Sequence, residues 1–176
     1  NAVWLPVGCD PTLAPAGAVA RDLDIAFVGT DGGVPRKFIM QALRERYPNS
    51  YIGTALHTQL PVLYSRARVG FNYSIRGEIN MRVFEALAAG ALLVTNRVRP
   101  QALTALGLRE GEHYVAYGSP RELWGCLDRW LADAAPRERL AAAGQAVAVS
   151  RHTYVHRVQQ LLAVATERLK ISTRSA

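Results

Sequence analysis

The sequence predicts an α/β fold, a doubly wound and mostly parallel β-sheet with helices on its faces and at the C-terminal end. Short apolar segments alternate with longer segments of helical periodicity from residue 24 onward, which is typical of consecutive βαβ units. The short segments are apolar at nearly every position, as in parallel strands that are covered on both faces. Glycine or proline separates most of the segments, where turns and helix ends are expected.

The first strand is expected at Ile25–Val28, an apolar run that ends at Gly29. Pro35 then stands where the first turn of a helix tolerates proline, and Pro48 stops that helix. Residues 51–53 form a second, short strand. A helix over 60–67 follows, and it leads into a third strand at 69–73.

The next helix is expected over 80–89, and Gly90 ends it in the way that glycine ends many helices. Two further strands are predicted at 92–95 and 113–117. One helix begins at Ser119-Pro120 and a second at Pro136. The last helix runs from about residue 153 to 169, and we expect one apolar side of it to face inward: Val155, Val158, Leu161, Leu162 and Ala165.

The composition fits one globular domain of 176 residues. Residues 1–22 are rich in Pro, Gly and Ala and are interpreted as an interdomain connector, residues 23–152 as the α/β domain, and residues 153–176 as a closing helix and tail. No apolar run is long enough for a transmembrane segment, and the first residues do not show the basic-then-apolar pattern expected of a signal segment. Because the chain begins with Asn1, we expect it to be a piece of a longer protein.

The net charge of +7 comes almost entirely from arginine, since lysine occurs only at Lys37 and Lys170. The arginine excess has two possible explanations. One is a coding bias toward arginine and alanine, and the other is the binding of anions such as phosphate, for which arginine is well suited. No basic run interleaves with aromatic residues, so no nucleic-acid partner is expected. Two distant cysteines, Cys9 and Cys126, exclude a disulfide scaffold and favour a cytoplasmic location.

Ligands of such sheets bind at the carboxyl ends of the strands, so the loops after the first and third strands are the candidates. The first loop offers Gly29 and Thr30, followed by Arg36 in the next helical turn. Glycines let a backbone approach a phosphate closely, and the helix start offers free amides. The alternative is a plain turn with solvated charges.

The second loop and its helix offer a larger set of candidate binding residues: Arg76, Gly77, Asn80, Arg82 and Glu85. The amides from Gly77 to Arg82 could hold a diphosphate, and the arginines could add charged hydrogen bonds. The Glu85 carboxylate suits a ribose diol. The alternative for Glu85 is an ion pair with Arg82 on an exposed helix face.

This segment resembles the C-terminal, nucleotide-sugar-binding half of glycosyltransferases of GT-B architecture. The match is Glu85-Ala86-Leu87-Ala88-Ala89-Gly90 followed by the apolar run 91–95, and the helix start Asn80-Met81-Arg82-Val83-Phe84-Glu85-Ala86 is similar to the CgeB-like branch. The resemblance implies a Rossmann-like domain that binds a nucleotide-diphospho-sugar as donor substrate, with no bound cofactor or metal. The spacing of His152 and His156 would also suit a metal pair, but no third ligand is evident in the sequence.

The resemblance also implies that an N-terminal acceptor domain is missing, so the isolated chain is expected to be inactive. The wider family has a glutamate eight residues before Glu85, where this chain has Gly77. Glu78, one residue out of register, is the weak candidate for a catalytic residue, and otherwise the catalytic residues are unknown. The alternative function is a non-catalytic binding or scaffolding module that keeps a relic nucleotide site.

Overall fold

The protein, seen in a computed structural model that describes residues 2–15, 17 and 19–174, contains a five-stranded sheet in the order β2-β1-β3-β4-β5. Every neighbouring pair of strands is parallel. The strands are β1 (Leu23–Val28), β2 (Tyr51–Gly53), β3 (Ala67–Asn72), β4 (Leu92–Asn96) and β5 (Val115–Tyr117). The predicted fold class, a doubly wound parallel sheet, is therefore confirmed.

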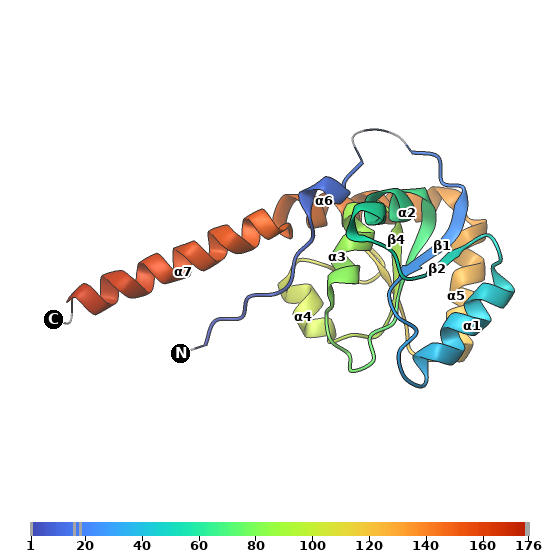
Figure 1. The fold of residues 1–176 in the computed structure, drawn as a ribbon, viewed down its shortest axis with the longest axis horizontal. Helices are drawn as coiled ribbons and strands as arrows, with labels where there is room; N and C mark the ends of the chain where they lie inside the picture. Colours follow the sequence, from blue (N-terminus) through green and yellow to red (C-terminus); the bar gives the residue numbers. More distant parts are fainter. Residues whose placement is uncertain (1, 16, 18, 175–176) are drawn as a thin grey trace.

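Helices cover both faces of the sheet (Figure 1). One apolar cluster joins one face to α1 (Arg36–Arg46) and α5 (Pro120–Ala132). The other cluster joins the opposite face to α2 (Leu60–Arg66) and α3 (Met81–Ala88). The long helix α6 (Ala134–Arg151) contributes Ala141 to the first cluster and Ala148 to the second.

One short helix, α4 (Pro100–Ala105), was not predicted from the sequence. It spans six residues, too few to show a helical repeat, and its Leu103 is buried in the α2–α3 cluster.

The segment before β1, interpreted from the sequence as a connector, also packs against the domain. It contains a short 3₁₀ helix, η1 (Pro11–Leu13), and the side chains of Cys9 and Leu13 are almost fully buried.

The prediction for the last helix, α7 (Tyr154–Arg174), is wrong in one respect. The residues expected to face inward are all exposed: Val155, Val158, Leu161, Leu162 and Ala165. The helix extends away from the sheet (Figure 1), so no described element covers this side. Periodicity identified the apolar face correctly, but periodicity does not say what packs against it.

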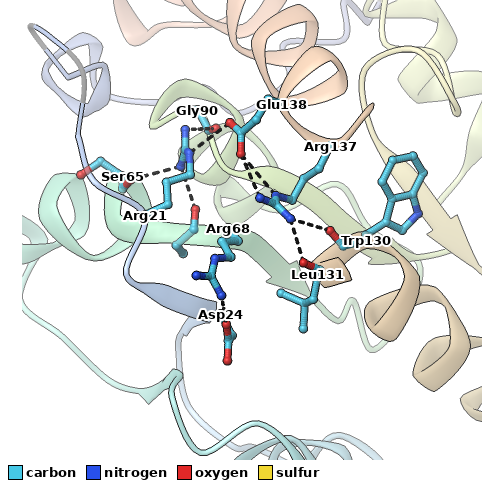
Figure 2. Close-up of polar contacts among 10 residues, drawn as sticks. Arg21, Asp24, Ser65, Arg68, Gly90, Trp130, Leu131, Arg137 and Glu138 are labelled. Atoms are coloured by element: carbon cyan, nitrogen blue, oxygen red, sulfur yellow. Dashed lines mark hydrogen bonds and ion pairs between the residues drawn. The ribbon is translucent and has the colours of Figure 1, made fainter. Parts of the chain in front are cut away.

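Arginines hold the amino-terminal edge of the sheet together (Figure 2). Arg21 donates to the carbonyl oxygens of Ser65 (3.1 Å), Ala67 (2.7 Å) and Gly90 (2.5 Å), where α2 and α3 end. Arg137 donates to the carbonyls of Trp130 and Leu131 at the end of α5. Cations at helix C-termini satisfy the last carbonyls and oppose the helix dipole. The ends of three helices are thereby fixed at the edge opposite the expected ligand site.

Small side chains allow α3 to lie close to the sheet. A Cβ atom built on Gly70 in β3 would stand 2.5 Å from the Cβ of Ala86 in α3. The helix therefore approaches the strand at a point where no larger residue fits. Because α3 carries Arg82 and Glu85, this contact also sets the distance of both side chains from the strand ends.

We expect Gly70→Ala to lower the free energy of unfolding by about 1–3 kcal/mol, the usual cost of overpacking a core. The matched control is Gly125→Ala in α5, where an added Cβ meets nothing within 4 Å. That change should raise the free energy of unfolding by about 0.5–1 kcal/mol, because glycine is unfavourable inside helices. Urea denaturation followed by circular dichroism measures both. A Gly70→Ala protein as stable as the parent would contradict the close approach of α3.

Candidate functional site

A groove opens at the carboxyl ends of β1 and β3, on the face that α2 and α3 cover. The strand order reverses here, since β2 lies outside β1 while β4 and β5 follow β3 on the other side, and ligands bind at such a switch point in open α/β sheets. The groove has a volume of ≈ 670 Å³. Its lining residues come from four separate segments: Val7, Val28, Arg36, Ala55, His57, Leu60, Glu78, Ile79, Asn80, Met81, Arg82 and Glu85.

Arg82 lies at the centre of the switch point. Its Nε donates to the carbonyl of Val28 at the end of β1 (2.8 Å), and its Nη1 donates to Oδ1 of Asn72 at the end of β3 (2.9 Å). The guanidinium stands 4.3 Å over the ring of Phe27, a cation–π contact. A Cβ at Gly29 would collide with Nη2 of Arg82. Gly29 therefore leaves room for Arg82, and its close approach to a phosphate stays a prediction.

Arg36 brings a second positive charge to the same groove from the start of α1. Its guanidinium donates to the carbonyl of Asp31 (3.3 Å) and to Oγ1 of Thr30 (3.4 Å), so the β1–α1 loop positions it. It forms no ion pair within the described residues. Burial, and to a smaller extent the charge of Arg36, lower the pKa of Arg82. Both side chains stay cationic at neutral pH, and an anion between them would relieve their repulsion.

Glu85, one helical turn after Arg82, also faces this groove. It is only 7% exposed. Its carboxylate accepts no hydrogen bond and forms no ion pair, with Arg82 or any other described residue. Burial raises the pKa of Glu85, while the charges of Arg82 and His57 partly oppose that rise. The alternative considered from the sequence, an Arg82–Glu85 ion pair on an exposed face, is therefore wrong.

The amino-terminal end of α3 is left open toward the groove. Asn80 stands at the N-cap position, yet its side chain makes no capping hydrogen bond, and its buried Oδ1 has no partner within the described residues. An uncapped helix start presents unpaired amides and the positive end of the helix dipole. The groove therefore combines two arginines and a helix start, which attract an anion, with unpartnered acceptors on Asn80 and Glu85.

The remaining sequence candidates lie at the edge of this arrangement or outside it. Arg76 and Thr30 are exposed and do not line the groove. Gly77 adopts a φ of 71°, which glycine accepts readily, and its carbonyl accepts from the amide of Arg99. Glu78 does line the groove, but its carboxylate accepts from the amide of Arg76 at 2.8 Å.

Hydrogen bonds of its own loop govern the ionisation of Glu78. Burial would raise the pKa of Glu78, but the polar groups of its own loop, among them the amide of Arg76, outweigh burial, and the pKa is lowered overall. A carboxylate that is held ionised in this way is poorly suited to donate a proton. A catalytic role for Glu78 stays a prediction, and its geometry favours a role in shaping the loop.

Sequence reasoning missed the wall of the groove formed by Ala55, His57 and Leu60. These residues follow β2, the edge strand next to β1. The signal was available, because the loop after a strand next to the switch point also reaches the ligand edge. Val7, from the segment before β1, carried no comparable signal.

The two histidines with metal-pair spacing have structural roles. Nε2 of His152 lies 2.8 Å from the carbonyl of Leu106, and its Nδ1 accepts from Arg157 at 2.7 Å. The described part of the chain contains no group of three His, Cys, Asp or Glu side chains able to hold a metal ion. In the same part, no helix is both long and apolar enough to cross a bilayer.

Residues 12–163 match a protein family described as glycosyl transferase-like. No sequence among the curated proteins matches the chain. Several solved structures do. HepE of Anabaena, in complex with UDP, superposes with a TM-score of 0.71 at 15% identity, over 91% of this chain and 56% of HepE.

Two further structures extend the comparison. Sucrose-phosphate synthase from Thermosynechococcus elongatus gives a TM-score of 0.68 at 17% identity, over 95% of this chain and 52% of the synthase. The C-terminal domain of LpcC, a glycosyl transferase group 1 family protein from Francisella tularensis, gives 0.60 at 13% identity, over 83% of this chain and 99% of that domain. The chain thus spans about half the length of HepE and of the synthase.

The raised pKa of Glu85 predicts how stability depends on pH. The folded state holds the Glu85 proton more tightly than the unfolded state, whose pKa lies near the ordinary value of 4.5. Ionisation of Glu85 therefore destabilises the fold as the pH rises through the window between the two values. We expect Glu85→Gln to match the parent near pH 4.5 and to be more stable by about 1 kcal/mol, the scale of burying an unpaired polar group, at pH 8.

The measurement is urea denaturation of both proteins at half-unit pH intervals. Glu45→Gln, an exposed change on α1, serves as the control and should show little pH-dependent difference. A stability difference for Glu85→Gln that shrinks as the pH rises would mean that the carboxylate has a partner in the folded protein.

Proposed function

Because the chain belongs to the family of glycosyl transferase-like proteins, we propose that it is the donor-binding, C-terminal domain of a GT-B glycosyltransferase. In this proposal the groove at the switch point holds a nucleotide-diphospho-sugar, whose sugar passes to an acceptor. The family and the fold support the general assignment. The further assignment to the CgeB-like branch rests on the motif of residues 80–86.

The single observation that carries the proposal is the unpartnered, buried carboxylate of Glu85 beside two arginines without counter-anions. Burying an unpaired charge is unfavourable unless a ligand compensates for it. A ribose diol supplies two hydroxyl donors for one carboxylate, and the neighbouring diphosphate supplies the anion that Arg36 and Arg82 lack. One nucleoside diphosphate therefore satisfies the carboxylate and the arginines together.

The diphosphate would lie between the β1–α1 loop and the start of α3. The guanidinium groups of Arg36 and Arg82 would donate charge-assisted hydrogen bonds, and the open end of α3 would add amide donors. The two arginines would neutralise the diphosphate, so we propose that no resident cofactor or metal is needed. A nucleotide-sugar donor also agrees with the cytoplasmic location expected from the scarcity of cysteine.

The base would extend from Glu85 along the wall formed by Ala55, His57 and Leu60. The transferred sugar would then lie at the opposite end of the groove, near Ile79 and Glu78. At that end the wider family has a glutamate where this chain has Gly77. A non-catalytic module with a relic nucleotide site would also lack this glutamate. Nucleotide binding and sugar transfer therefore need separate tests.

We further propose that an acceptor domain precedes this chain in the complete protein. The chain spans about half of HepE but matches nearly all of the LpcC C-terminal domain. Apolar side chains near the start of the chain are exposed, namely Val3, Trp4, Leu5 and Val7. Exposed apolar side chains of this kind, which also occur on the uncovered side of α7, are typical of a contact with another domain.

Nucleoside diphosphates should raise the melting temperature of the chain, and one of the uridine, guanosine, adenosine and thymidine diphosphates should raise it most. Arg36→Ala should weaken binding of that diphosphate by about 1.5–3 kcal/mol, the worth of a hydrogen bond to a charged group, and leave the bare nucleoside almost unaffected. Glu85→Gln should weaken both ligands by about 1–3 kcal/mol, because both contain the ribose. Titration calorimetry at two salt concentrations measures these effects, and salt should weaken the diphosphate more.

The matched control is Lys37→Ala, which removes a positive charge next to Arg36 from a side chain that does not line the groove. It should bind the diphosphate nearly as well as the parent. Equal binding by the parent, Arg36→Ala and Glu85→Gln would place the ligand elsewhere. No response to any of the four diphosphates would favour the non-catalytic scaffold.

The isolated 176-residue chain should show no measurable sugar transfer, because closure of the cleft around the donor needs a second domain. The measurement is release of nucleoside diphosphate from a set of nucleotide sugars, with and without sugar acceptors, using a chain already shown to bind the diphosphate. Turnover that depends on an acceptor would show that this chain alone completes the active site.

A further inference from the structure

A second hollow lies on the opposite face of the sheet from the groove. Its volume is ≈ 410 Å³, within the range of roughly 300–1,000 Å³ that is typical of small-molecule sites. It is bounded by the start of α1, the ends of β3 to β5 and the start of α5. Most of the residues that line it present rings: Pro35, Phe38, Tyr73, Tyr117, Pro120 and Trp124.

Flat apolar walls predict the shape of an occupant. Phe38 is 62% exposed although it belongs to the first turns of α1, and Trp124 faces the hollow from α5. Aromatic side chains interact best with other planar rings, by offset stacking or edge-to-face contact. A flat ring system would therefore contact these walls more closely than a puckered ring or a flexible chain.

The polar groups of the hollow predict the chemistry of the occupant. Tyr117 is only 3% exposed, and its buried hydroxyl has no hydrogen-bond partner within the described residues. Its ring stacks on Phe71, with centroids 6.0 Å apart and an interplanar angle of 11°, so the hydroxyl cannot easily move away. An unsatisfied buried hydroxyl is unfavourable and is uncommon in native proteins.

Arg97 supplies a positive charge at the same place. Its backbone amide donates to the carbonyl of Tyr117 at 3.1 Å, which holds the two residues side by side. Its exposed side chain lines the hollow and makes no hydrogen bond or ion pair within the described part of the chain. The Glu122 carboxylate accepts from the amide of Gly118 at 2.7 Å and forms no ion pair with Arg97 within the described residues.

We infer that this hollow is a second small-molecule site, and that it takes a planar aromatic ring system bearing a carboxylate. The ring lies between Phe38 and Trp124, and the carboxylate accepts from the Tyr117 hydroxyl and the Arg97 guanidinium. The site is separate from the proposed donor groove, and neither assignment depends on the other. It draws its polar groups from β5 and the loop after β4, neither of which lines the groove.

The first experiment is calorimetric titration of the chain with 2-naphthoate and with its neutral analogue 2-naphthalenemethanol. The carboxylate should bind about tenfold more tightly than the alcohol, because a hydrogen bond to a charged group is the stronger one. Arg97→Gln should remove most of this preference. Trp124→Ala should weaken both probes, whereas Trp4→Ala, which removes an exposed tryptophan outside the hollow, should change neither.

The second experiment separates binding from folding. Tyr117→Phe deletes a hydroxyl that has no protein partner, so the variant should be at least as stable as the parent and should bind 2-naphthoate about three- to tenfold more weakly. The matched variant is Tyr47→Phe, because Tyr47 donates to Asp128 at 2.7 Å. That change should lower stability and leave naphthoate binding unaltered.

Three results would overturn the inference. They are no naphthoate binding by the parent, binding that Arg97→Gln and Trp124→Ala leave intact, or a marked loss of stability in Tyr117→Phe. The last result would show that the hydroxyl already has a partner in the protein.

Discussion

The position of one guanidinium governs the architecture of the groove. Arg82 donates hydrogen bonds to Val28 at the end of β1 and to Asn72 at the end of β3. It therefore links the two strands at the point where the strand order reverses. That position requires α3 to lie close to the sheet, which the Gly70–Ala86 contact permits, and requires Gly29 to have no side chain. Once Arg82 is fixed in this way, Glu85 follows one turn later and faces the same groove.

The two edges of the sheet use arginine in different ways. At the amino-terminal edge, Arg21 and Arg137 are surrounded by the carbonyls that end three helices, and Glu138 pairs with both (Figure 2). At the carboxyl edge, Arg36 and Arg97 have no anionic partner within the described residues. The buried charge of Arg137 is therefore satisfied within the protein, whereas the half-buried Arg36 and the exposed Arg97 keep their charges available to a ligand. The arginine excess of the sequence therefore has no single explanation.

The start of α1 separates the two hollows of the carboxyl edge. Arg36 lines the groove on one side, while Pro35 and Phe38 line the ring-walled hollow on the other. Both positions follow from the helical period, since consecutive residues on a helix point in different directions. The sequence placed Arg36 in the site correctly. It gave no comparable indication for the second hollow, which assembles from loops after β3, β4 and β5 that are far apart in the chain.

The sequence alone determined the elements that depend on local chemistry. Apolar runs specified the five strands, proline and glycine specified most helix limits, and Ser119 caps α5 through the amide of Glu122 as its residue type suggested. The motif around Asn80 and Glu85 is likewise visible in the sequence. Tertiary structure decided what depends on distant residues: that Glu85 is buried without an ion pair, that His57 shares its groove, and that one side of α7 is uncovered. The physical reason is that periodicity and residue type describe what a segment can do, whereas burial and partnership are properties of the segments that fold against it.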